Sequence, residues 1–404
     1  MKRREQGYTL VELLISILLT SIVVSALYAV SRTATETFNQ QQRTAEMQLR
    51  LRFAMEQIRA DLSRAGYMST PNSTTDPRVC PRPTTAYQGL EITRTSPNPT
   101  VLPADNLYIN PITLRMTGNY VTADEYTVAG ISGSTLSLQN QSPQWARVQS
   151  QAEFNRIFGT AMSPRLLRIM STSGQMQFAV SMGGTWVSSS STGLPTLLLT
   201  TTPLVQGAGA SSSSAGAGCG LAGLGVGATV APLMMIEYQI GSLATRLTEL
   251  YPADPAASAA KTDLIRREYD LRPGPEEVTT AARLVGEYAV DFDATIAYDL
   301  GNPANTIGAQ PSMRTLAFGD TNITTLAGSV SGGGGSARPQ QIRSLIVRLS
   351  IRDREQEPTF GWVVRGTTSA LTRFRVFDTR TGAARVRSLV TEIAVPNLAI
   401  RNLR

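Results

Sequence analysis

Side chains that commonly perform catalysis are scarce in this 404-residue chain, which contains no histidine. A chain without histidine cannot build a Ser-His-Asp site, a Cys-His site or a HExxH zinc motif. The two cysteines, Cys80 and Cys219, are too few for a four-ligand zinc site. In an exported domain they are expected to form one disulfide, and buried or free thiols are the alternative. These observations predict no enzyme, no catalytic residue, no cofactor and no metal.

Two short motifs point only weakly to ligand binding. Residues 218–223 read Gly-Cys-Gly-Leu-Ala-Gly and match GxGxxG, but Pro232 interrupts the segment after them and no strand–helix–strand unit surrounds them. Asp291, Asp293 and Asp299 lie close together in the sequence. The residues between them are typical of a strand, so a solvated strand edge or turn is favoured over a calcium site.

Arginine supplies most of the basic residues, because Lys2 and Lys261 are the only lysines. The formal net charge is +7. A GC-rich genome explains the preference for arginine over lysine more simply than a surface for phosphates or acidic partners does. Nucleic acid is the less favoured partner, because no aromatic residues suited to base stacking are interleaved with the arginines. The candidate arginines are Arg348, Arg352, Arg354, Arg373, Arg375, Arg380, Arg385 and Arg387.

Glu12 is the residue whose position most strongly demands a function. It is the only charged residue in an apolar run from Tyr8 to Val30. At about 1.5 Å per residue this run spans roughly 35 Å as a helix, enough to cross a bilayer. A carboxylate inside such a segment is costly, so we expect Glu12 to need a partner during assembly. The alternative is that it snorkels to the membrane interface.

The basic residues Lys2, Arg3 and Arg4 precede this run. They predict an inner-membrane protein with a single span, a cytoplasmic N-terminus and an exported body. An ordinary secretory signal fits poorly, because its apolar region is shorter and ends at a small-residue cleavage site. Here the apolar run continues directly into a further helical pattern.

One long helix is predicted from Tyr8 to Ala65, about 87 Å in length, because no glycine or proline occurs from Thr9 to Ala65. Its first half is apolar all round and its second half is amphipathic, with Gly66 as the stop signal. The apolar stripe of the second half comprises Met47, Leu51, Met55, Ile58, Leu62 and Ala65.

The rest of the chain predicts strands separated by long loops. Residues 67–104 are rich in Pro, Thr and Ser and predict a loop, and residues 183–228 and 332–336 are of low complexity. Strand patterns occur at 126–129, 135–138, 166–170, 176–180, 234–240, 345–351, 371–377 and 386–400. An antiparallel sheet with one apolar face needs a cover, which the amphipathic half-helix can supply. The predicted fold class is α+β: a long N-terminal helix packed on an antiparallel β-sheet, with long loop and strand insertions.

The segment from Gly7 to Ser16, Gly-Tyr-Thr-Leu-Val-Glu-Leu-Leu-Ile-Ser, resembles the class III signal of type IV prepilins and type II secretion pseudopilins. The resemblance implies that a prepilin peptidase cuts between Gly7 and Tyr8, that Tyr8 is N-methylated, and that Glu12 docks the subunit into a filament. Tyr8 departs from the usual phenylalanine. The new ammonium would neutralise a neighbour's carboxylate in an apolar core, where unpaired charge is costly. The implied membrane and filament-core residues are Leu10, Val11, Leu13, Leu14 and Ile15.

Later segments narrow the resemblance to the PilW family of minor pilins. This resemblance rests on the order in which six segments follow one another along the chain: residues 58–67, 236–238, 264–268, 284–292, 342–353 and 395–403. The family implies a low-abundance subunit that primes a type IV pilus near its tip. Its partners would be other minor pilins, the major pilin and the inner-membrane assembly platform, with a tip adhesin as a further candidate. A J-type pseudopilin and a tip adhesin or DNA-binding minor pilin remain the alternatives.

The implied organisation has five segments. They are a leader at 1–7, a membrane and filament-core half-helix at 8–30, an amphipathic half-helix at 31–66, a variable insertion at 67–232 and a β-rich headgroup at 233–404.

Overall fold

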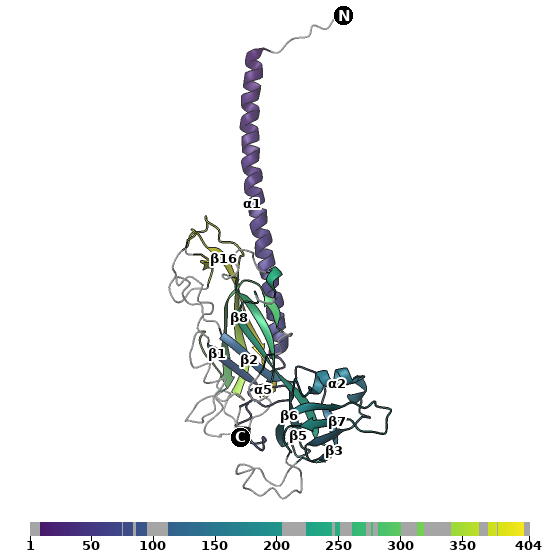
Figure 1. Ribbon diagram of the computed structural model, residues 1–404. Coiled ribbons are helices and arrows are strands. Elements are labelled where there is room, and N and C mark those ends of the chain that lie inside the picture. The colour runs from purple at the N-terminus through teal and green to yellow at the C-terminus, as the bar shows by residue number, and fades with distance from the viewer. Residues whose placement is uncertain are drawn as a thin grey trace, which may run out of the picture. The chain divides into compact units, whose positions relative to one another are not determined.

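The chain divides into two compact units, Met1–Arg50 and Leu51–Arg404. A computed structural model of the chain (Figure 1) describes residues 9–74, 76–83, 86–94, 112–203, 224–244, 247–250, 261–271, 276–277, 282–299, 313–318, 341–362, 371–377 and 379–399.

Helix α1 runs from Leu10 to Leu62, which confirms one long N-terminal helix. Its 53 residues correspond to about 80 Å. The helix ends three residues before the predicted Ala65, because the following backbone bonds tighten: Arg64 donates to the carbonyl of Asp61, and Ala65 to that of Leu62. Gly66 then adopts a φ of +75°, a left-handed conformation that a side chain would strain.

An eleven-stranded sheet forms the larger part of the second unit. Strand β8, Thr229–Gly241, lies at its centre: its first residues pair with β3 and β5, and its later ones with β2 and β9. All pairings between named strands are antiparallel. The other strands are β1 Leu90–Arg94, β2 Ile112–Gly118, β3 Tyr126–Ser132, β4 Thr135–Leu138, β5 Arg165–Met170, β6 Met176–Thr185, β7 Thr196–Leu199, β9 Asp263–Asp270, β10 Glu276–Glu277 and β11 Arg283–Gly286.

A second, five-stranded antiparallel sheet follows in the chain, with the order β13-β12-β14-β16-β15. Its strands are β12 Ala289–Asp299, β13 Met313–Thr315, β14 Ile342–Arg352, β15 Arg373–Phe374 and β16 Ala384–Ala394. The main hydrophobic core joins both sheets to the end of α1, which contributes Leu51, Ala54, Met55, Ile58 and Leu62. The predicted packing of an amphipathic helix on antiparallel strands is therefore confirmed, and the fold is α+β.

Strands β3 to β7 surround a second hydrophobic core together with helix α2, Gln151–Phe158. Ser150 caps α2 by accepting a hydrogen bond from the backbone of Glu153. Aromatic rings fill this core edge-on: Tyr126 lies 6.0 Å from Trp145 and 5.0 Å from Phe158. Two short 3₁₀ turns, Trp145–Arg147 and Thr248–Leu250, complete the described elements before the C-terminal helix α5, Pro396–Ala399.

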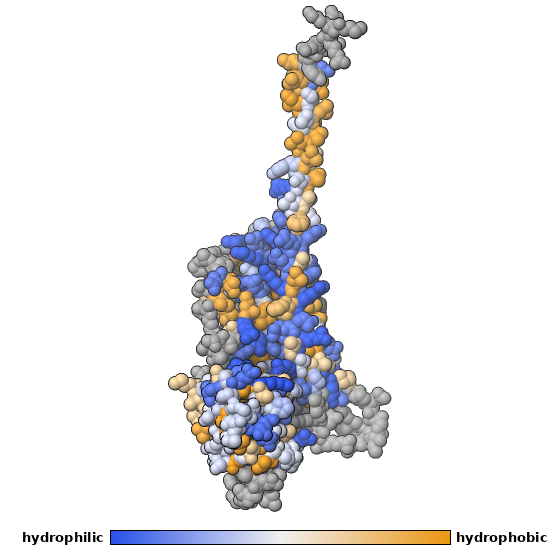
Figure 2. All heavy atoms as spheres, turned by 90° about the vertical axis from the view of Figure 1, so that its right-hand side faces the viewer, coloured by the Kyte–Doolittle hydropathy of each residue, from blue (hydrophilic) through white to orange (hydrophobic). Residues whose placement is uncertain are grey.

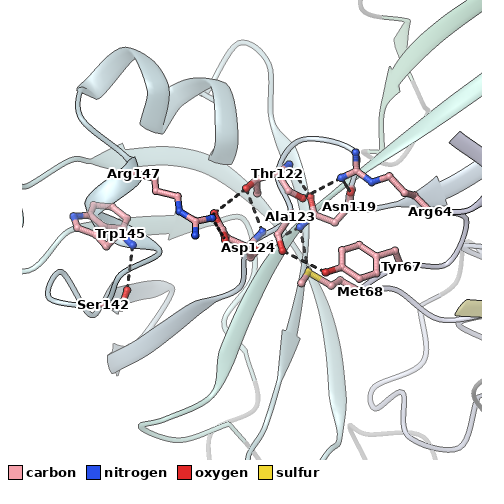
Figure 3. A network of polar contacts seen from close by, with 10 residues as sticks. All are labelled: Arg64, Tyr67, Met68, Asn119, Thr122, Ala123, Asp124, Ser142, Trp145 and Arg147. Atoms are coloured by element: carbon pink, nitrogen blue, oxygen red, sulfur yellow. Dashed lines mark hydrogen bonds and ion pairs between the residues drawn. The ribbon is translucent and has the colours of Figure 1, made fainter. Parts of the chain in front are cut away.

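A polar junction connects the end of α1 to the second core (Figure 3). Arg64 donates to the carbonyls of Asn119, at 2.6 Å, and Thr122, at 3.3 Å. Beyond Thr122, Asp124 accepts from Arg147 at 2.8 Å. The two bonds from Arg64 satisfy backbone carbonyls of the turn between β2 and β3, and the ion pair of Asp124 with Arg147 ties this turn to the second core.

The structure corrects three strand predictions. The loop expected over 67–104 contains strand β1, whose Leu90 and Ile92 are buried in the main core. The strand expected over 386–400 ends at Ala394, because Pro396 cannot donate to a ladder and starts helix α5. Only Arg373 and Phe374 of the strand expected over 371–377 pair with a neighbour.

Candidate processing and assembly site

The first described turn of α1 is closed by Thr9 and Glu12. The backbone N–H of Glu12 donates to the hydroxyl of Thr9 at 3.3 Å, and the Glu12 carboxylate accepts from the N–H of Thr9 at 3.4 Å. This reciprocal pair is a capping box, which satisfies two backbone donors at the open end of the helix. The carboxylate also lies at the positive end of the helix dipole, where a negative charge is favoured. Glu12 is therefore held at a fixed place on the helix.

The helix surface around Glu12 is apolar and exposed. Side chains at Leu10, Val11, Leu13, Leu14 and Ile15 are all exposed by more than half. Figure 2 shows this hydrophobic surface in orange along the first part of α1. Among the described residues, α1 is the one helix long and apolar enough to cross a membrane, judged by length and composition. Such a surface is stable in lipid or against other apolar helices.

The hydroxyl groups of this segment do not interrupt its apolar character. Ser16 donates to the carbonyl of Leu13 at 2.9 Å, Thr20 to that of Ser16 at 2.6 Å, and Ser25 to that of Ser21 at 2.7 Å. Each hydroxyl is thus satisfied inside the helix. Glu12 remains the group whose desolvation would leave a charge to be neutralised.

The remaining predicted processing residues, Gly7 and Tyr8, lie outside the described residues. Cleavage between them would place a new ammonium one residue before Thr9 and close to the capping box. A carboxylate and an ammonium near one helix end can pair within a chain or between neighbouring chains. The cleavage and methylation predictions stay predictions.

Of the two cysteines predicted to form a disulfide, only Cys80 lies in the part of the chain that the structure describes. Cys80 is buried and disulfide-bonded. Cys219, the other cysteine of the chain, lies outside the described residues, so the pairing of Cys80 with Cys219 stays a prediction. Residues 218–223, which match GxGxxG, lie outside the described residues as well.

A buried ion pair, which the sequence did not reveal, fixes the second half of α1 on the sheet. Asp61, on the last turn of α1, accepts from Arg266 of β9 at 2.7 Å and from the Tyr238 hydroxyl of β8 at 2.6 Å. Glu268 is a second acidic partner of Arg266. Burial alone would lower the pKa of Arg266, but the carboxylate of Asp61 outweighs it and raises the pKa. Burial and the same carboxylate raise the pKa of Tyr238.

Several of the arginines considered as candidates for binding nucleic acid contact acidic side chains or aromatic rings within the chain. Arg348 pairs with Asp291 at 2.7 Å and with Asp293 at 3.4 Å, and Arg385 pairs with Glu357 at 3.0 Å. Arg352 is buried beside Tyr288, and burial lowers its pKa to about 10. Within the described ranges, no group of three or more acidic, histidine or cysteine residues is arranged to hold a metal ion.

Asp293 should give the stability of the second unit a measurable pH dependence. Its side chain is fully buried, and burial raises its pKa above the ordinary value of 3.8 although Arg94 and Arg348 oppose the shift. A raised folded-state pKa contributes stability that is present below pH 3.8 and lost as the pH rises through the folded pKa. We therefore expect Asp293→Asn to melt slightly above the parent protein at pH 7, with the difference vanishing on acidification.

Thermal melts of the purified chain between pH 3 and pH 8 would check this expectation, with Glu56→Gln on the exposed helix face as the control. A loss of stability in Asp293→Asn at pH 7 that shrinks on acidification would show instead that the contacts of the carboxylate with the arginines outweigh the cost of burial.

Two structural features were not predicted from the sequence: the capping role of Thr9 and the ion pair of Asp61 with Arg266. The capping role of Thr9 could have been predicted, because Thr-x-x-Glu before an apolar run is the signature of a capping box. The Asp61–Arg266 pair was not, because 205 positions separate its members and nothing local marks either residue.

Comparison with known proteins supports the interpretation of the N-terminus. Residues 2–28 match the prokaryotic N-terminal methylation motif. No curated protein and no solved structure matches the chain. This motif implies processing by prepilin peptidase and assembly with other pilins, and the single apolar helix fits the membrane anchor typical of pilins. The motif and the helix together support a type IV pilin-like or pseudopilin-like protein.

Proposed function

We propose that this chain is a minor pilin similar to the PilW family, which helps to prime assembly of a type IV pilus after prepilin peptidase has cleaved it between Gly7 and Tyr8. The observation that carries the proposal is the methylation motif at residues 2–28, joined to a helix on which Glu12 is the lone charge of an exposed apolar surface. The role is structural: a filament subunit acts through its contacts.

The proposed cellular course follows from this helix. Residues 1–7 form the leader, residues 8–30 hold the chain in the inner membrane with a cytoplasmic N-terminus, and the body lies in the periplasm. After cleavage, the ammonium of Tyr8 and the carboxylate of Glu12 provide complementary charges for docking in an apolar filament core. The partners are prepilin peptidase, other minor pilins, the major pilin and the assembly platform, with a tip adhesin as a further partner.

The second hydrophobic core supports a place near the tip. Strands β3 to β7 and helix α2 are inserted between β2 and β8 and enclose a core of their own. A subunit at the end of a filament has neighbours on fewer sides than one within it, so it tolerates such additional volume. This is why we favour a priming minor pilin over the J-type pseudopilin of a type II secretion filament.

An in-frame deletion in the native organism tests the proposal. Surface pili would be counted by electron microscopy while the type II secretome is quantified from the same cultures. We expect pili to be lost with secretion intact, and the wild-type gene supplied in trans to restore them. Lost secretion with normal pili would assign the chain to the pseudopilins, and no change in either would overturn an assembly role.

A further inference from the structure

The short helix α5, Pro396–Ala399, contacts the end of helix α1 although the two are far apart in the chain. The side chain of Asn397 donates to the carbonyl of Ser63 at 2.8 Å, across 334 positions. Leu398 is fully buried in the main core. Pro396 ends the ladder of β16 and begins α5, because proline lacks a backbone donor and favours the first position of a helix. The end of α1 is therefore completed by residues that follow every strand of both sheets in the chain.

Two glycines form the floor of the site that receives Leu398. A Cβ on Gly66 would lie 2.8 Å from Cδ2 of Leu398, and a Cβ on Gly89 would lie 2.5 Å from the same atom. Two carbon atoms cannot pack that closely, so the leucine side chain occupies the space that the two absent side chains leave open. The site accepts a leucine only because glycine stands at both positions.

Backbone bonds that do not involve α5 build this floor. The N–H of Gly66 donates to the carbonyl of Thr117 at 2.9 Å, and the N–H of Thr117 donates to the carbonyl of Gly89 at 3.2 Å. The N–H of Gly89 in turn donates to the carbonyl of Pro71 at 3.0 Å. The turn after α1, the start of β1 and strand β2 therefore form the receiving site among themselves, before α5 reaches it.

Helix α5 is small compared with the elements that it contacts. It is a single turn in which the N–H of Leu398 bonds back to the carbonyl of Val395. Its anchors are the buried side chain of Leu398 and the side-chain bond of Asn397, whereas Pro396 is exposed. A contact of this size can open locally while both sheets stay folded, because its free energy of opening is a fraction of that of global unfolding.

We propose that α5 is a latch that closes on the end of α1 after the sheets have folded, and that a subunit enters a filament only when this latch is closed. The second half of this inference rests on the proposed assembly function. During synthesis and export the residues of α5 follow those of every strand, and contacts between distant positions form late. Until the latch closes, the carbonyl of Ser63 lacks its donor and the site of Leu398 is empty, so the last turn of α1 is held less firmly.

Hydrogen exchange of the purified full-length chain tests whether the latch acts locally. Leu398→Ala should speed the exchange of amides 59–66 by about tenfold or more, because the closed form loses the burial of a leucine. Exchange in α2, Gln151–Phe158, should not change. Asn397→Ala removes one hydrogen bond and should speed the same amides about fivefold. The matched control is Leu197→Ala, at a fully buried leucine of the second core, which should speed exchange in α2 and not at 59–66.

A double variant tests the contact between the leucine and the glycine floor. Gly89→Ala should speed exchange at 59–66 as Leu398→Ala does, because the added methyl group displaces the leucine from its site. The φ of Gly89 lies outside the left-handed region, so alanine brings no backbone strain of that kind. When Gly89→Ala and Leu398→Ala are combined, the methyl group meets a shortened side chain, and the two effects should add to less than their sum. Fully additive effects would overturn the assigned contact.

Two outcomes of the exchange experiment would overturn the latch. One is unchanged exchange at 59–66 in both Leu398→Ala and Asn397→Ala. The other is equal acceleration at 59–66 and in α2, because α5 would then be an inseparable part of the whole fold. If Leu398→Ala does not fold, Asn397→Ala decides by the same two criteria.

Pilus counts test the role of the latch in assembly. With Leu398→Ala as the only copy, we expect normal cleavage by prepilin peptidase and fewer surface pili at an equal amount of processed chain on immunoblots. Normal pili in this strain, together with lost pili in the deletion strain, would reject the role of the latch in assembly and leave the proposed function standing. Normal pili in both strains would reject the proposed function, and with it the claim that the latch admits subunits to a filament.

Discussion

Glu12→Ala is expected to be cleaved by prepilin peptidase like the parent chain but to assemble into filaments about tenfold less, or not at all. The loss follows from desolvation: the carboxylate lies among exposed apolar side chains, and a complementary charge compensates it only when the subunit docks. Alanine removes the attraction that selects the correct position along the apolar surface. The measurements are the size of the processed chain on immunoblots and the number of surface pili, with the variant as the only copy.

Glu12→Gln separates the charge of this residue from its capping role. Glutamine at this position can still accept from the backbone of Thr9 and so keep the capping box. If the charge docks the subunit, Glu12→Gln should fail in assembly as Glu12→Ala does. Assembly by Glu12→Gln would show instead that a well-formed helix start suffices.

Gly7→Ala supplies the uncleaved reference for both variants. We expect this chain to resist cleavage, to migrate at the size of the precursor and to yield no assembled subunit. Wild-type pilus numbers in the Glu12→Ala strain would contradict the docking role of Glu12.

Asp61→Ala is expected to destabilise the second unit, Leu51–Arg404, by about 3–5 kcal/mol, because it breaks a buried ion pair by removing one partner. Asp61 is 7% exposed and Arg266 is 8% exposed. The substitution leaves the guanidinium paired with Glu268 alone among the described acidic residues and leaves the Tyr238 hydroxyl without its acceptor. Because Asp61 belongs to α1 and Arg266 to β9, the loss should also loosen the helix on its sheet.

Chemical unfolding of the purified full-length chain, followed by tryptophan fluorescence, would measure this effect. Asp61→Asn keeps an acceptor for Tyr238 and should lose less than Asp61→Ala. Arg59→Ala breaks the exposed pair of Arg59 with Glu56 at 3.8 Å and should change stability by less than about 1 kcal/mol. Equal, small effects of Asp61→Ala and Arg59→Ala would show that the buried pair contributes little.

The features on which the candidate N-terminal site rests are local features of the sequence. The apolar run, the lone Glu12 and the absence of helix breakers are local features, and a helix is built from bonds between residues four positions apart. The same locality explains why the apolar stripe from Leu51 to Leu62 correctly indicated the buried face of α1. Strands in which apolar and polar residues alternate clearly, such as β8 and β14, were also predicted from the sequence.

Only the tertiary structure decided how these elements combine. Strand β1 lies in a sequence rich in loop-forming residues, and its five positions are held as a strand by pairing with β2 and by burial in the main core. The order of the two sheets, the use of β8 by both halves of the larger sheet and the pairing of Asp61 with Arg266 depend on contacts between distant positions. Such features depend on the packing and pairing energies of residues far apart in the sequence. A short stretch of the sequence therefore cannot predict them.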